Sequence, residues 1–86
     1  MTTLRIALAQ TRQTADREDN RRVILEAIDA AAAQEVQILC FPETQTVGYR
    51  CDIAPATAPV PVAWLEEVHG QVADRCRGLG MACIVG

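Results

Sequence analysis

The run Val36–Glu43, with the sequence VQILCFPE, places the tightest constraint on the fold. Its apolar part contains β-branched and aromatic residues and is too short for a helix, which is typical of a buried strand in a parallel sheet. Pro42 ends the strand because proline cannot donate a hydrogen bond to a sheet ladder. Glu43 therefore follows the carboxyl end of a central strand, where open α/β sheets place their ligands. A glutamate after a strand is also commonly a solvated or capping charge, so position alone leaves both interpretations open.

The remaining hydrophobic pattern predicts two further strands and two helices. Alternating apolar residues near the start indicate a strand, and Asp16 is a good N-cap for a helix with one apolar stripe. A second helix begins at Pro61, since proline is tolerated in a first turn, and ends before Gly80. The predicted elements are, in order, strand 4–10, helix 16–34, strand 36–41, helix 61–79 and strand 81–85. This βαβαβ order predicts an α/β fold with a parallel sheet and right-handed crossovers, in one domain of residues 1–86.

Several short motifs support a more specific interpretation. Phe41-Pro42-Glu43 is followed by Gly48-Tyr49 and preceded by the strand Arg5–Gln10. Further similar residues are Asn20, Ala31, Ala32 and Ile84-Val85-Gly86. Together they resemble the amino-terminal part of the nitrilase superfamily, the carbon–nitrogen hydrolases. The resemblance implies that the chain is a βαβαβ parallel-sheet fragment of that family's α-β-β-α sandwich, in which two sheets pack face to face with helices outside.

The same resemblance implies a chemistry. Carbon–nitrogen hydrolases hydrolyse a non-peptide amide, or less often a nitrile or related C–N bond, with a Glu, a Lys and a Cys. The motif maps the general-base glutamate onto Glu43. All eight basic residues are arginines, so the sequence contains no lysine. Because the family's Lys and Cys lie on later strands, we expect the 86-residue chain to be inactive alone. The resemblance implies no cofactor and no metal.

Four other residues are weaker site candidates. Tyr49 either lines the entrance of the substrate pocket or pins its loop. Cys51 lies eight residues from Glu43, but no neighbouring cation or imidazole favours its thiolate, so we interpret it as non-catalytic. His69 lies mid-helix without a second ligand at metal spacing, and Trp64 is expected in the core. Cys40, Cys76 and Cys83 fall in apolar stretches and are interpreted as small core residues.

Composition excludes several classes of function. The net charge of −3 provides no basic surface for nucleic acid or an anionic membrane. The start of the chain lacks the pattern of a secretory signal, and no apolar run approaches the ~20 residues that span a bilayer, so we expect a cytoplasmic protein. The first loop has no glycine, unlike dinucleotide-binding and P-loop motifs. The alternatives are a non-catalytic α/β interaction module and, less favoured for want of acidic residues after the first strand, a receiver-like or flavodoxin-like domain.

The fragment interpretation has a consequence for the sheet. If both helices pack on one side, alternation along the strands leaves one set of apolar side chains uncovered. That set is either Leu4, Ile6, Leu8, Ile38 and Ile84, or Leu39, Phe41 and Val85. We therefore expect a homo-oligomer, or a chain that needs a carboxy-terminal part to cover this face, with a small amide or nitrile as the substrate of the intact family.

Overall fold

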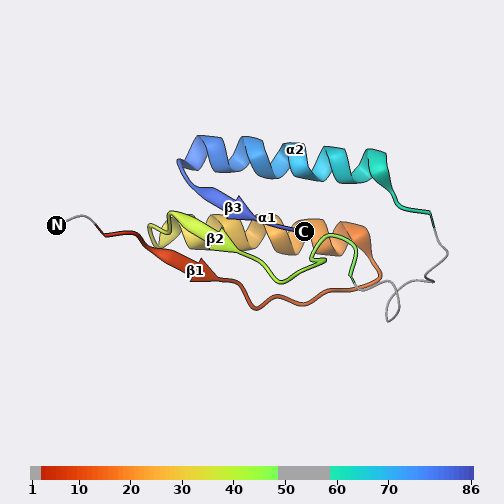
Figure 1. The fold of residues 1–86 in the computed structure, drawn as a ribbon, viewed down its shortest axis with the longest axis horizontal. Coiled ribbons are helices and arrows are strands. Elements are labelled where there is room, and N and C mark those ends of the chain that lie inside the picture. The colour runs from red at the N-terminus through yellow and green to blue at the C-terminus, as the bar shows by residue number, and fades with distance from the viewer. Residues whose placement is uncertain (1–2, 49–58) are drawn as a thin grey trace.

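The computed structural model describes residues 3–48 and 59–86. Three parallel strands form one sheet in the order β1-β2-β3, with a helix after each of the first two strands (Figure 1). The elements are β1 (Ile6–Leu8), α1 (Arg17–Ala33), β2 (Ile38–Cys40), α2 (Val62–Leu79) and β3 (Ala82–Ile84). The α/β class and the βαβαβ order are therefore as predicted, and β2 is the central strand.

The strands are shorter than the sequence predicted. Ranges 4–10, 36–41 and 81–85 each reduce to three paired residues. Hydrogen bonds still continue at the ends of the ladder, from the Ala9 amide to the Cys40 carbonyl at 2.8 Å and from the Phe41 amide to the Ile84 carbonyl at 2.9 Å. Alternating apolar residues identify segments that can adopt an extended backbone. A residue belongs to a strand only where a neighbouring strand pairs with it, so the predicted strand lengths were wrong.

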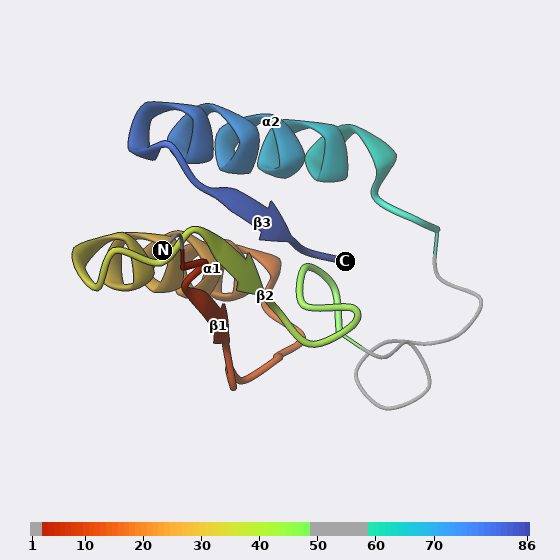
Figure 2. The same ribbon diagram turned by 60° about the vertical axis from the view of Figure 1, so that its left-hand side comes forward.

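Both helices cover the same face of the sheet (Figures 1 and 2). The strand order advances in one direction, so two crossovers of the same hand must place α1 and α2 on one side. The core lies between them and the inward face of β2. Its buried members are Ile24, Ile28, Ala31, Val36, Leu39, Phe41, Val68, Val72, Cys76 and Met81.

The opposite face of the sheet is apolar and exposed. Leu8 is 78% exposed and Ile84 is 62% exposed, and the register places both beside Cys40. Leu4 and Ile6 are also exposed, and Ile38 is half-buried. The uncovered set is thus the first of the two that the sequence left open.

The helix ends follow the sequence in different ways. As predicted, the Asp16 side chain caps α1 by accepting from the amides of Glu18 and Asp19. At the other end no glycine is present, and Glu35 adopts a positive φ of 60° to close the turn. Leu79, the last residue of α2, is 44% exposed, because the helix has reached the edge of the core there.

A polar cluster joins the two helices at their outer surface. The Trp64 ring lies 5.4 Å from the Arg21 guanidinium and 5.7 Å from that of Arg17, within the range of cation–π attraction. Its indole N–H donates to Glu18 at 2.8 Å, and Arg21 also pairs with Glu67 of α2 at 2.9 Å. Trp64 is half-buried and packs against the core from outside, between the helices, and does not lie within the core as the sequence predicted.

Candidate functional site

Glu43 lies after the carboxyl end of the central strand, as predicted. β2 ends at Cys40, Phe41 is buried, and Glu43 opens a turn over residues 43–47 with its own side chain exposed. Since all three strands are parallel, their carboxyl ends share this edge of the sheet. The edge carries the candidate site.

The backbone of this turn is tightly constrained. Thr44 has a positive φ of 57°, a conformation that costs a residue with a side chain about 1–2 kcal/mol. The turn closes through a hydrogen bond from the Gly48 amide to the Thr44 carbonyl at 2.7 Å. A strained residue next to the candidate base is a feature that surrounding contacts must maintain, and such residues cluster at functional sites.

The end of β3 supports the turn from one side. The Thr46 amide donates to the Gly86 carbonyl at 2.9 Å, and both ribbon views show the C-terminal end of the chain beside the turn (Figures 1 and 2). The approach is close, because a Cβ at Gly86 would lie 3.2 Å from the Thr44 amide nitrogen. The carboxyl ends of β2 and β3 therefore meet where Glu43 is placed.

The loop after β1 supports the turn from the other side. The Gln13 side chain donates to the Glu43 carbonyl at 2.8 Å. Gln45, which is fully buried, donates to the Arg12 carbonyl at 2.7 Å and accepts from the Thr11 hydroxyl at 2.7 Å. The amide side chains thus fix the backbone on both sides of Thr44.

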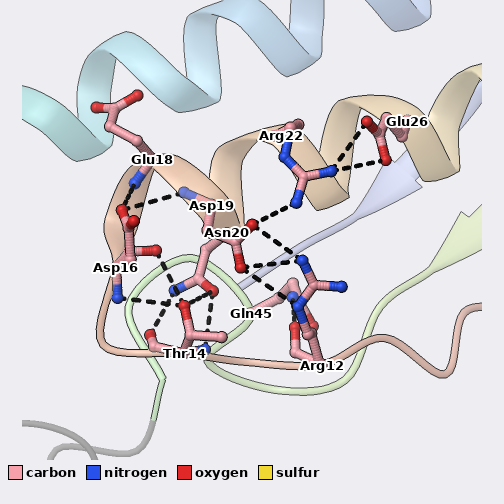
Figure 3. A network of polar contacts seen from close by, with 9 residues as sticks. All are labelled: Arg12, Thr14, Asp16, Glu18, Asp19, Asn20, Arg22, Glu26 and Gln45. Atoms are coloured by element: carbon pink, nitrogen blue, oxygen red, sulfur yellow. Dashed lines mark hydrogen bonds and ion pairs between the residues drawn. The ribbon is translucent and has the colours of Figure 1, made fainter.

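Asn20 connects this assembly to α1 (Figure 3). Its fully buried side-chain amide donates to the carbonyls of Thr14, at 2.9 Å, and Thr46, at 3.0 Å. Its oxygen accepts from the Thr14 amide at 2.9 Å and from the Thr14 hydroxyl at 3.2 Å. Every donor on the Asn20 amide is satisfied, so one residue binds helix, loop and turn together.

A charged group holds the same loop to the helix from outside (Figure 3). Arg12 forms a two-pronged contact with the Asp19 carboxylate, at 2.9 and 3.3 Å, and Arg22 donates to Asp19 as well. Hydrogen bonds from Arg22 and then Arg12 lower the pKa of Asp19 below its usual value, since both favour the carboxylate. Arg12 is the loop residue whose carbonyl accepts from Gln45.

Of the four weaker candidates, His69 and Trp64 fall within residues 3–48 and 59–86. Tyr49 and Cys51 lie outside the described residues. His69 is exposed in α2 and lines a cavity with Cys76 and Cys83. Glu43 is not among the residues that line this cavity. Within residues 3–48 and 59–86, no three His, Cys, Asp or Glu side chains are arranged to hold a metal ion. Neither helix in that part of the chain is long and apolar enough to cross a membrane.

Sequence reasoning missed the supporting amides. Asn20 carried a usable signal, because it lies four residues before Ile24 on the apolar stripe of α1, where a polar residue must find buried partners. Gln45 carried none: it follows Glu43 in an irregular segment, and its partners come from a loop more than 30 residues away.

Comparison with known proteins is consistent with this arrangement. A model of the family described as Carbon-nitrogen hydrolase matches residues 5–86. That range includes all three strands, both helices and Glu43. Comparisons with curated proteins and with solved structures gave no match.

Proposed function

Because the chain belongs to the carbon–nitrogen hydrolase family, we propose that it is the amino-terminal part of an enzyme that hydrolyses a non-peptide amide or nitrile, and that Glu43 is the general base. The observation that carries the proposal is the place of Glu43, which follows the Phe-Pro motif at the carboxyl edge of the central strand. Ligands of open α/β sheets bind at such an edge.

In the proposed reaction Glu43 handles the proton at two steps. The carboxylate first takes the proton of a cysteine thiol, so that the sulfur can attack the substrate carbon and form an acyl-enzyme. It then takes a proton from the water that hydrolyses the acyl-enzyme. A lysine would stabilise the negative charge on the tetrahedral oxygen. The sequence contains no lysine, so the lysine must come from residues other than these 86.

The contacts around residues 43–47 support this role. A general base must stay within hydrogen-bond reach of the proton that it removes, which is a constraint of a few tenths of an ångström. Gln13 and Asn20 bind the backbone of the turn from outside it, and Gln45 within the turn binds the loop after β1. An exposed glutamate that served only for solubility would not require a turn fixed in this way.

The exposed sheet face supports the sandwich architecture. We propose that a second sheet of the family's α-β-β-α fold covers Leu4, Ile6, Leu8 and Ile84. Burying a large apolar side chain stabilises a fold by about 1.5–3 kcal/mol, so this face forfeits on the order of 5–10 kcal/mol while uncovered. Either a carboxy-terminal part or a partner protomer would recover that free energy.

The test uses the protein encoded by the whole open reading frame that contains the codons for residues 1–86. We expect its product to contain a Lys and a Cys at strand ends and to release ammonia from simple amides or nitriles. Glu43→Gln should lower kcat/KM by about 10²–10⁴-fold, the usual contribution of a general base. Glu66→Gln, an exposed glutamate on α2, is the matched control and should leave the rate unchanged.

The 86-residue chain provides the second arm. It should show no turnover with the same substrates, because a base without a nucleophile has nothing to activate. If the pure 86-residue chain hydrolyses these substrates and Glu43→Gln abolishes that activity, the proposed requirement for further residues is contradicted. Cys51 would then be a candidate nucleophile. Full activity of Glu43→Gln in the longer product would show that Glu43 is not the base.

A further inference from the structure

The side-chain amide of Gln13 contacts two consecutive residues of the turn, Glu43 and Thr44. Its Nε2 donates to the Glu43 carbonyl oxygen at 2.8 Å. The Thr44 hydroxyl lies 2.6 Å from the same carbonyl oxygen and 3.2 Å from the Oε1 of Gln13, so it can donate to either. The peptide group that joins the candidate base to Thr44 therefore has two donors within reach of its carbonyl oxygen.

Rotation of this same peptide group would relieve the backbone strain of Thr44. Its φ of 57° is one that residues with a side chain rarely adopt. Rotating the peptide group between Glu43 and Thr44 would carry this φ to a negative value, as in the difference between type II and type I turns. The rotation would also turn the Glu43 carbonyl away from Gln13 and change the ψ of Glu43.

Such a rotation would reach the carboxylate of the candidate base. The side-chain rotamers that a residue can adopt depend on its backbone angles. A changed ψ at Glu43 would thus favour other positions of its carboxylate, whereas a general base must stay within hydrogen-bond reach of the proton that it removes. The orientation of one peptide group therefore decides where the base points.

Gln13 differs from the other two amides that support the turn. Asn20 and Gln45 are fully buried, whereas Gln13 is half-buried. A hydrogen bond that water can reach contributes little net stability, because water replaces a lost partner. Removing the Gln13 amide should therefore leave the fold intact and release only the peptide group that it contacts.

We propose that Gln13 is a positioning residue, which holds the Glu43–Thr44 peptide group in its strained orientation and so directs the Glu43 carboxylate. The inference rests on the proposed function, in which Glu43 is the general base. In this role Gln13 acts through Glu43 and takes no part in the proton transfer itself.

The test measures steady-state hydrolysis by the longer reading-frame product. Gln13→Ala should lower kcat about 10–100-fold, since misplacing a reacting group by about 1 Å has an effect of this size. The KM and the urea midpoint should stay at the parent values. Gln71→Ala is the matched control, because Gln71 is an exposed glutamine of α2 whose side chain accepts one hydrogen bond from Arg21, at 3.1 Å. It should leave kcat unchanged.

Two double variants separate positioning from a general effect on the fold. In the Glu43→Gln background, Gln13→Ala should lower the rate by less than about twofold, because no base remains to be positioned. In the Thr44→Gly background it should lower the rate by less than about threefold, because glycine adopts a positive φ without strain and the peptide group no longer tends to rotate.

The outcomes distinguish this inference from the proposed function. An equal loss from Gln13→Ala in the parent, Glu43→Gln and Thr44→Gly backgrounds would overturn the positioning role. A normal kcat for Gln13→Ala beside a slow Glu43→Gln would also overturn it, while leaving Glu43 as the base. Full activity of Glu43→Gln would overturn the proposed function and this inference with it.

Discussion

Asn20 joins α1 to the loop just before it and to the turn after β2, 26 residues away, and its burial makes each of its hydrogen bonds matter. Its amide contacts Thr14 of the loop and Thr46 of the turn. A buried donor or acceptor left without a partner costs about 1–3 kcal/mol, whereas a hydrogen bond at the surface is nearly neutral. The candidate base therefore depends on a residue that lies outside the site.

We expect Asn20→Ala to lower the free energy of unfolding by about 2–4 kcal/mol, since it leaves the Thr46 carbonyl and the Thr14 amide without this hydrogen-bond partner. Urea unfolding of the longer reading-frame product, followed by the helical circular dichroism signal at one fixed protein concentration, measures the change. Glu66→Ala on the exposed face of α2 should remain within about 0.5 kcal/mol of the parent. A loss from Asn20→Ala no larger than that of Glu66→Ala would show that water replaces the amide.

Asp19 gives the protein an acid-sensitive contact. Its pKa is lowered in the folded state by hydrogen bonds from Arg22 and Arg12, so the unfolded chain binds its proton more readily. The contribution of Asp19 to stability is therefore complete above its unfolded pKa near 4. It is lost as the pH falls through the lower folded value.

The corresponding experiment compares the parent with Asp19→Asn between pH 2.5 and pH 6. The parent should lose more stability than the variant as the pH falls below about 4. Parallel curves for the two proteins would mean that the Arg12 and Arg22 contacts do not favour the Asp19 carboxylate in solution.

At the scale of the elements, the two helices end in the same geometry with different residues. Glu35 closes α1 with φ 60°, its amide bonded to the Ala32 carbonyl and that of Val36 to the Ala31 carbonyl. Gly80 closes α2 with φ 67°. These are left-handed caps, for which glycine carries no steric penalty and glutamate carries one of about 1 kcal/mol.

Opposite substitutions at the two caps should have opposite effects. Glu35→Gly should raise the urea midpoint by the equivalent of about 0.5–1 kcal/mol, since the Arg5–Glu35 ion pair is long and exposed and contributes little. Gly80→Ala should lower it by about 1 kcal/mol. Nothing lies within 4 Å of a Cβ at Gly80, so any loss there reports the backbone conformation. A stability loss from Glu35→Gly would indicate that the side chain contributes more than the strain.

For the whole molecule, the uncovered sheet face dominates behaviour in solution. The forfeited burial of about 5–10 kcal/mol is comparable with the net stability of a typical domain, about 5–15 kcal/mol. Exposed apolar surfaces of this kind are interaction sites. We therefore expect the purified 86-residue chain to be oligomeric, aggregating or molten.

Sedimentation with thermal unfolding tests this expectation. Leu8→Lys/Ile84→Glu places charges on the exposed face without touching the core and should reduce self-association at least tenfold in Kd. The same pair of substitutions on the helix-covered face, at Ala7 and Cys83, should abolish folding instead. A parent that is a monomer with one sharp transition would favour the non-catalytic interaction module over the fragment of a sandwich.

The sequence by itself determined the features that depend on neighbours a few residues apart. Asp16 as a cap, Pro42 as the end of β2 and Glu43 beyond it follow from backbone chemistry that operates wherever these residues occur. The tertiary structure decided the rest. The alternation of side chains along the strands defined two possible exposed faces of the sheet. The strand order β1-β2-β3 with right-handed crossovers put both helices on one face, which left Leu8 and Ile84 exposed on the other. Thr46, which accepts from Asn20, lies 26 residues away, and the partners of Gln45 lie 33 and 34 residues away. The pairing of each buried side-chain amide with a carbonyl depends on which distant segments the fold brings together. Local sequence propensity contains no information on these long-range contacts.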